Sequence, residues 1–223
     1  MEFFHILTQQ QTLAPIMLTF KTLGVASLLI LTLGTALGYY LTGERTVTRS
    51  VVDFFVTLPL VFPPIASGFV LLMLLGRSGL FGQFLPVKIV FSFIGVVLAS
   101  VVAGLPFMVK SVETALKGDL KKLIELSHVL GKDNWQTFWL VILPNIKRGI
   151  ASGLFLALGR SLGEVGITLM LGGNILGKTN TLSLEIYNAV FSGEFDRAMV
   201  LATVIGVLSL SVCFILRRVG AQF

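Results

Sequence analysis

Five long apolar runs limit what this chain can fold into more than any other feature of its sequence. They cover residues 22–41, 51–75, 89–109, 149–171 and 198–216, and an amphipathic lead-in at 15–21 precedes the first. A helix of roughly 20 apolar residues spans a bilayer, whereas the strands of a membrane barrel would show shorter segments of alternating polarity. Charged residues make up only 13% of the chain, well below the share of about a quarter in soluble domains. We therefore expect an all-α integral membrane protein with about five transmembrane helices, in a single domain over residues 1–223.

A polar hairpin at residues 125–144 separates the third run from the fourth. One face of its predicted first helix carries an apolar stripe, made of Leu120, Leu123, Ile124, Ser127 and Leu130. Gly131 is suited to end this helix in a left-handed conformation. Asp133 or Asn134 is suited to cap a second short helix through Phe138, and Pro144 to mark the turn into the next span. We interpret the stripe as a docking face for a soluble partner; the alternative is an ordinary solvated loop.

The spacing within this hairpin carries a family resemblance. Glu125, Gly131, Leu143 and Pro144 stand where the EAA loop of ATP-binding-cassette (ABC) importer permeases, Glu-Ala-Ala-x3-Gly-x9-Ile-x-Leu-Pro, has the same residues. The two alanines and the isoleucine are replaced by Leu126, Ser127 and Val141. The resemblance implies that a coupling loop, at about residues 117–146, sits in a groove of a separate ATPase subunit. Its implied coupling residues are Glu125, Ser127, Gly131, Leu143 and Pro144.

Other segments are similar to one branch of that family, the molybdate-type permeases. They are the proline-rich 58–64, the turn at 75–82, and the signatures at 159–166 and 173–179, so the likeness runs from about residue 20 to 218. The resemblance implies the type I ABC importer permease fold, and a homodimer that lines a central path in the bacterial cytoplasmic (inner) membrane. It also implies ABC ATPase subunits at the cytoplasmic face, an extracytoplasmic substrate-binding protein, and import of an oxyanion. Molybdate is the favoured substrate, with tungstate or sulfate as alternatives.

The basic residues predict the orientation in the membrane. If the hairpin is cytoplasmic, eleven lysines and arginines lie on its side and five on the other, which satisfies the positive-inside rule. The eleven are Arg45, Arg49, Lys110, Lys117, Lys121, Lys122, Lys132, Lys147, Arg148, Arg217 and Arg218, and the five are Lys21, Arg77, Lys88, Lys178 and Arg197. This arrangement puts the N-terminus outside and the C-terminus inside. The positive charge therefore reports orientation rather than binding to nucleic acid.

Three prolines and one charged pair are the candidates for the translocation path or its gate. Pro59, Pro63 and Pro64 fall within one predicted span, where they kink or unwind a helix; we favour a role beside a gate over a role in packing alone. Arg160 and Glu164 are four residues apart in the fourth run, so a shared helix face predicts an ion pair. Intramembrane charges are functional candidates by default, although a structural pair that fixes helix packing is slightly favoured over direct contact with substrate.

Small residues and one further carboxylate carry weaker predictions. The pairs Gly34-x3-Gly38, Gly149-x3-Gly153 and Gly159-x3-Gly163 permit close helix approach. Asp53 is expected to pair with Arg45 or Arg49, which lie close to it in the sequence.

The segment 172–179 satisfies the phosphate-binding expression G-x4-G-K-T, but a genuine P-loop requires a preceding strand and an α/β core. We interpret it as a glycine-rich external turn; the alternative is that Lys178 guides oxyanions at the outer mouth. Catalytic constellations and metal-ligand spacings are absent from the sequence, since His5, His128 and Cys213 are isolated. We therefore predict no cofactor, no bound metal and no enzyme activity of the chain's own, because the resemblance puts ATP hydrolysis in a separate subunit. A polytopic membrane enzyme or a secondary transporter remains the rival reading.

Overall fold

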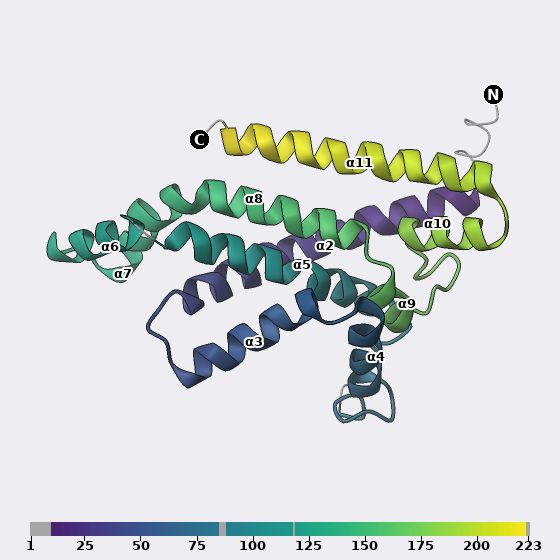
Figure 1. The fold of residues 1–223 in the computed structure, drawn as a ribbon, viewed down its shortest axis with the longest axis horizontal. Helices are drawn as coiled ribbons and strands as arrows, with labels where there is room; N and C mark the ends of the chain where they lie inside the picture. Colours follow the sequence, from purple (N-terminus) through teal and green to yellow (C-terminus); the bar gives the residue numbers. More distant parts are fainter. Residues whose placement is uncertain (1–9, 85–87, 118, 222–223) are drawn as a thin grey trace.

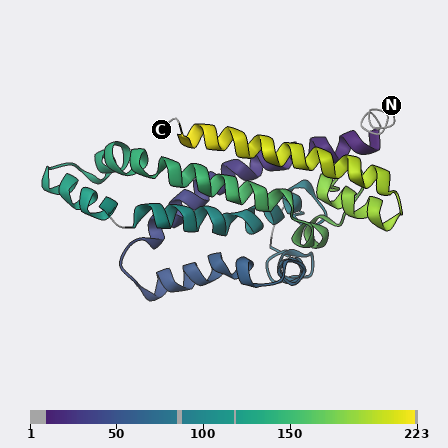
Figure 2. The ribbon, with the colours of Figure 1, turned by 45° about the horizontal axis from the view of Figure 1, so that its top comes forward.

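The computed structural model describes residues 10–84, 88–117 and 119–221, and within these ranges every regular element is a helix. Four long helices run lengthwise beside one another (Figures 1 and 2) and make the body of the molecule. They are α2 (Gln10–Leu41), α5 (Phe93–Leu116), α8 (Leu143–Leu162) and α11 (Phe195–Ala221). The hairpin helices lie at one end of this bundle, and α10 (Leu182–Phe191) lies at the other. The all-α fold class is confirmed.

Four helices in the described part of the chain are long and apolar enough to cross a membrane. They are Thr12–Leu41, Phe93–Leu116, Asn134–Leu162 and Phe195–Ile215, and the shorter apolar helix Pro64–Leu75 accompanies them. The predicted second span, 51–75, is divided into α3 (Val47–Val61) and α4 (Pro64–Leu75). Phe62 and Pro63 are extended between the two, and α4 turns sharply away from α3 (Figure 1). Proline lacks an amide donor and disfavours a helical residue before it, so the break falls at the proline pair.

The fourth span also has bounds that differ from the prediction. Its helix α8 ends at Leu162, and a break at 163–165 leads into α9 (Gly166–Gly172). At its start, α8 continues without interruption from α7 (Asn134–Thr137) through a π-helical turn, Phe138–Ile142. Pro144 therefore lies in the first turn of α8, and the prediction that it marks a turn is wrong. Proline has no amide hydrogen to donate to the preceding turn, and the π-helical turn lies directly before Leu143 and Pro144.

Helix α5 is the most buried element of the bundle. It is capped by Ser92 at its start and continues past Pro106 without a break. Its residues Val97, Val101, Met108 and Val112 belong to a buried core shared with α2 and α8. Thus α5 forms the centre around which the other long helices pack.

Two of the three predicted glycine pairs bring helices close together. A Cβ on Gly38 of α2 would lie 2.7 Å from Val112 Cβ. A Cβ on Gly149 or Gly153 of α8 would lie 2.5 or 2.7 Å from the Cβ atoms of Ala115 or Ser111. Only glycine fits at such distances. Gly159, in contrast, faces open space, so the third pair makes no close approach.

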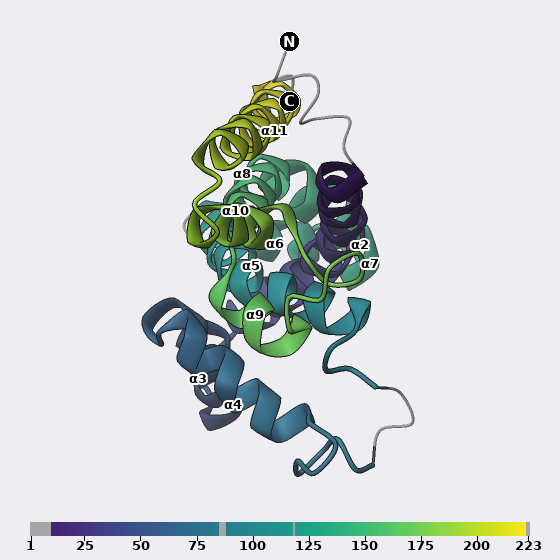
Figure 3. The same cartoon turned by 90° about the vertical axis from the view of Figure 1, so that its right-hand side faces the viewer.

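Helices α3 and α4 form an arm that stands away from the bundle (Figure 3). Among the described residues of α3, only Val56 is buried. Many large apolar side chains on the arm are exposed, namely Val47, Val51, Phe54, Phe55, Leu60, Val61, Ile65, Phe69, Val70 and Met73. The arm therefore presents an apolar surface that this single chain does not cover.

Candidate functional site

The hairpin at the end of the bundle has the turn geometry that its sequence predicts. Helix α6 (Asp119–Val129) is followed two residues later by a glycine, Gly131, whose φ is +76°. Its amide donates to His128 O at 3.0 Å, and the Lys132 amide donates to Ser127 O at 3.0 Å. These two bonds form a Schellman motif, which satisfies carbonyls at the end of the helix. The predicted left-handed cap is confirmed.

The second arm of the hairpin is fixed by one cap and one buried hydrogen bond. Asp133 Oδ1 accepts a hydrogen bond from the Gln136 amide at 2.7 Å and so caps α7. The Ser127 and Thr137 hydroxyls lie 2.9 Å apart and are buried. This contact joins α6 to α7, so Ser127 holds the hairpin together from inside.

Three members of the predicted apolar stripe face inward, whereas Leu123 and Leu130 are 43 and 71% exposed, so only part of the stripe can serve as the predicted docking face. Leu120 and Ser127 are buried, and Ile124 packs on the core beside Phe138 and Val141. Leu130 of the stripe and three large apolar side chains outside it are exposed on the hairpin. We call these residues the outer face: Leu126, Val129, Leu130 and Trp135, which are 54, 82, 71 and 70% exposed.

The other predicted coupling residues lie beside this outer face or at its base. Glu125 is exposed on α6. Leu143 is half-buried and Pro144 exposed in the first turn of α8. The π-turn links both to the hairpin, so α7 and α8 form one continuous helix over Asn134–Leu162.

Arg160 and Glu164 form the predicted ion pair, with 2.6 Å between Arg160 Nη1 and Glu164 Oε2. They do not share a helix face, because Glu164 lies in the break after α8. Its other oxygen, Oε1, accepts the Ile167 amide at 2.7 Å, and the residue is only 2% exposed. A buried carboxylate needs such partners. Glu164 therefore binds α8 to the start of α9.

The two helix breaks meet. A Cβ on Gly166 would lie 2.9 Å from Ile65 N and 3.0 Å from Pro64 Cβ, so the start of α9 is pressed against the start of α4. The structure thus brings Pro63 and Pro64 close to the Arg160–Glu164 break. Pro59 lies inside α3, four residues before Pro63.

The segment 172–179 forms a self-bonded turn between α9 and α10. The Thr179 hydroxyl donates to Gly172 O at 2.7 Å and accepts the Ile175 amide at 2.9 Å. Thr179 is fully buried, and helices rather than strands flank the turn. Its hydroxyl closes the turn instead of facing a phosphate. Across the residues that the structure describes, no group of three or more acidic, histidine or cysteine side chains is placed to hold a metal ion.

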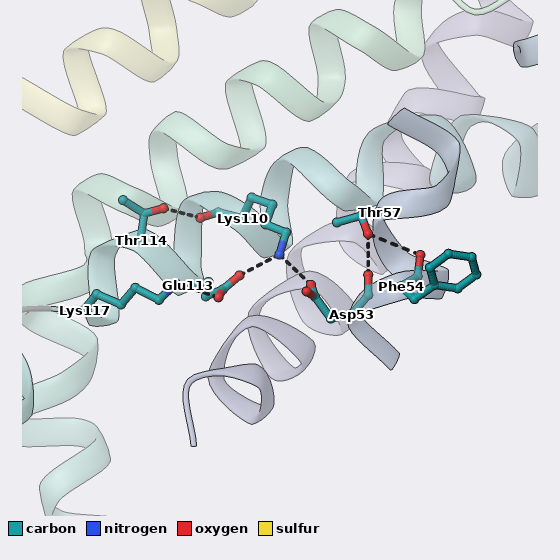
Figure 4. Close-up of polar contacts among 7 residues, drawn as sticks. All are labelled: Asp53, Phe54, Thr57, Lys110, Glu113, Thr114 and Lys117. Carbon is teal, nitrogen blue, oxygen red and sulfur yellow. Dashed lines mark hydrogen bonds and ion pairs between the residues drawn. The ribbon is translucent and has the colours of Figure 1, made fainter. Parts of the chain in front are cut away.

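Sequence reasoning missed two polar clusters. In the first, Lys110 Nζ lies 2.5 Å from Asp53 Oδ1 and 2.9 Å from Glu113 Oε2 (Figure 4). Lys117 Nζ lies 2.8 Å from the other oxygen of Glu113, Oε1. The expected partner of Asp53, Arg45 or Arg49, is therefore wrong. The spacing of Lys110, Glu113 and Lys117 was the available signal, since residues three and four apart meet on a helix.

The second missed cluster lies at the end of the bundle opposite the hairpin. Glu185 is buried and pairs with Arg197, and its Oε2 accepts the Asn180 side-chain amide at 2.8 Å. Asn174 and Asn188 extend the network. The cluster borders a cavity of about 700 Å³ at the start of α2 and α11.

Comparison with known proteins identifies the group to which this architecture belongs. The sequence profile of the family described as "Binding-protein-dependent transport system inner membrane component" matches residues 13–219. The chain belongs to this family. The resemblance to ABC importer permeases is confirmed, and the family is described as an inner membrane component of transport systems.

Individual relatives of the family cover nearly the whole chain. The chain is 34% identical over 211 residues to the molybdenum transport system permease protein ModB of Azotobacter vinelandii, covering 93% of each. It is 32% identical over 215 residues to ModB of Escherichia coli (strain K12), covering 93% of this chain and 94% of the relative. It is also 28% identical over 225 residues to the sulfate transport system permease protein CysT of E. coli, covering 100% of this chain and 81% of CysT.

A solved structure has the same fold. The crystal structure of a bacterial ABC transporter involved in the import of the acidic polysaccharide alginate has a chain that matches with a TM-score of 0.77 at 18% identity. The match covers 100% of this chain and 83% of that chain. The type I ABC importer permease fold is confirmed.

Proposed function

We propose that this chain is the permease subunit of an importer for a tetrahedral oxyanion, with molybdate as the favoured substrate. The proposal is supported by the two ModB proteins, whose identity and coverage of their own length exceed those of CysT. Sulfate and tungstate are the alternatives, because all three are tetrahedral dianions and an external binding protein can discriminate among them. No cofactor is needed for this role.

The outer face of the hairpin is the observation that carries the ATPase-docking part of the proposal. It combines exposed leucine, valine and tryptophan side chains with Glu125 at its edge. An apolar projection of this kind indicates a protein contact, and a helix docked into a groove is a common form of such contacts. We assign it the groove of a separate ABC ATPase, with residues 117–146 as the coupling loop.

Alternating access follows from this assignment. ATP binding would draw the two ATPase subunits together and move the attached hairpins, which would shift a two-state bundle between inward- and outward-facing forms. The junction of the two helix breaks, with Pro63, Pro64, Arg160 and Glu164, is the proposed place where the bundle rearranges. Pro59 lies one helical turn before it in α3.

Two further parts of the proposal concern assembly. The exposed apolar arm of α3 and α4 is proposed as the contact with a second copy, which would give a homodimer around a central path. The hairpin is proposed to face the cytoplasm, with the N-terminus outside and the C-terminus inside. The second polar cluster, around Glu185 and Arg197, would then lie on the side of the extracytoplasmic binding protein.

Co-purification with the ATPase of the same transport system tests the docking assignment. Val129→Glu places a charge at an 82% exposed position of the outer face, and Leu176→Glu is its matched control, 75% exposed at the opposite end of the bundle. We expect V129E to lose the ATPase and L176E to retain it. Retention of the ATPase by V129E would refute docking through this face. Uptake of molybdate and of sulfate by the reconstituted complex then assigns the substrate.

A further inference from the structure

A groove of about 430 Å³ lies between the end of α3, the second half of α5 and the first half of α8. Its lining includes Leu60, Lys110, Ser111, Thr114, Ser152 and Leu156. The floor exists because the glycines at 149 and 153 let α8 approach α5 closely. The groove therefore combines the ammonium group of Lys110 with three hydroxyls, inside helices that are otherwise apolar.

The donors in this groove are available to a ligand. In the part of the chain that the structure describes, neither the Ser111 nor the Ser152 hydroxyl has a hydrogen-bond partner. The Thr114 hydroxyl, in contrast, donates to Lys110 O at 2.7 Å. Hydroxyls and an ammonium group are donors that suit the oxygens of an anion.

The carboxylates around Lys110 occupy the position that an anion would take. Asp53 reaches Lys110 from α3 (Figure 4), and Asp53 and Lys110 have side chains 44% and 36% exposed. Helix α3 is loosely held, with Val56 its only buried residue among those described. Asp53 is therefore a partner that Lys110 can release, whereas Glu113 lies on the same helix and is also held by Lys117.

We infer that this groove is a transient oxyanion site on the translocation path, formed by Lys110, Ser111 and Ser152, with Asp53 as the carboxylate that the oxyanion displaces. The inference rests on the proposed function. Competition between Asp53 and the substrate keeps binding weak, which conduction requires because an ion that binds must also leave. The opposite role, a permanent ion pair that only fixes α3 to α5, predicts no ligand and gives different results below.

Cysteine protection tests the site without transport or an ATPase. The chain has one cysteine, Cys213, so Cys213→Ser supplies a background for Leu156→Cys, a groove position that is 46% exposed and is not a proposed ligand. The matched control is Leu210→Cys, 71% exposed on α11 outside the groove. Each purified protein is labelled with a water-soluble anionic methanethiosulfonate, with sodium molybdate, sodium sulfate, or sodium chloride at equal ionic strength.

We expect molybdate or sulfate to slow labelling of L156C but not of L210C, and chloride to slow neither. Lys110→Gln should raise the oxyanion concentration that halves the labelling rate (the half-protecting concentration) about tenfold, the loss expected when one charge-assisted hydrogen bond is removed. Lys110→Arg keeps the positive charge and should retain most of the protection. Asp53→Asn should lower that concentration several-fold, because the competing carboxylate is removed.

Three results would overturn the inference. The first is that L156C is not labelled at all, and the second is that chloride protects L156C as well as molybdate and sulfate do. The third is that D53N leaves the half-protecting oxyanion concentration unchanged or raises it. The D53N result decides the matter even if K110Q fails to fold, because the permanent-pair role predicts only lower stability. No ATPase is present in the labelling experiment, so a result that overturns the oxyanion site does not bear on docking of the ATPase. The co-purification experiment, in turn, does not bear on the oxyanion site.

Discussion

The close packing of α8 on α5 predicts opposite effects for one substitution at two glycines of the same helix. Gly153→Ala would place a Cβ 2.7 Å from Ser111 Cβ and 3.0 Å from Met108 Sδ. Gly159→Ala would meet no atom within 4 Å. Both changes gain the helix preference of alanine over glycine, about 0.5–1 kcal/mol. Only the first must separate two packed helices, which costs about 1–3 kcal/mol.

Because the helix preference is common to both variants, the difference between them isolates the packing cost. We expect G153A to be less stable than G159A by about 1–3 kcal/mol, and G159A to be slightly more stable than the unchanged protein. Unfolding in mixed micelles, followed by helical circular dichroism, measures both. Gly206→Ala on α11, also in open space, is a second control. A G153A protein as stable as G159A would show that α5 and α8 do not approach as described.

Three further predictions concern charge, turn and hydroxyl positions. Arg160→Gln should destabilise the protein more than Glu164→Gln, by up to about 3 kcal/mol, because it leaves the 2% exposed Glu164 without its ion partner; thermal unfolding in detergent compares them. Gly131→Ala should destabilise the end of α6 by about 1–2 kcal/mol, because the φ of Gly131 is +76°. The variant should show faster hydrogen exchange at the end of α6 and weaker coupling of ATP hydrolysis to uptake; unchanged exchange would contradict the cap. Thr22→Val should be neutral or stabilising, since the buried Thr22 hydroxyl has no hydrogen-bond partner within the described chain. Thr19→Val should lower stability by about 1–3 kcal/mol, because it removes the hydrogen bonds of the Thr19 hydroxyl to Pro15 O and the Leu182 amide; equal melting temperatures of the two variants would contradict both predictions.

The sequence predicts local features of this fold well. The left-handed cap at Gly131, the cap at Asp133 and the break at Pro63 each depend on a few neighbouring residues, so the local pattern determines them. The Arg160–Glu164 pair was found for the same reason. Helix α8, which carries Arg160, ends at Leu162, however, and periodicity alone does not show that Glu164 lies beyond the end of this helix.

Features that depend on distant segments were harder to predict. Asp53 and Lys110 are 57 positions apart, so no spacing rule links them. The hairpin has apolar residues on both sides of α6, and helical periodicity cannot tell which side packs on α7. The buried Ser127–Thr137 contact decides this by placing the side of α6 that carries Ser127 inward. The domain extent, the coupling residues and the path residues stay predictions.

The uninterrupted helix from Asn134 to Leu162 makes the hairpin one end of a rigid lever. Its 29 residues give a length of about 43 Å at 1.5 Å per residue, so a tilt of about 10° displaces one end by about 7 Å relative to the other. The near end carries Trp135 of the outer face, and the far end stops at the break where Gly166 presses on Pro64 and Ile65. A small rotation imposed at the hairpin would therefore become a displacement of atomic dimensions at the seam between the two helix breaks.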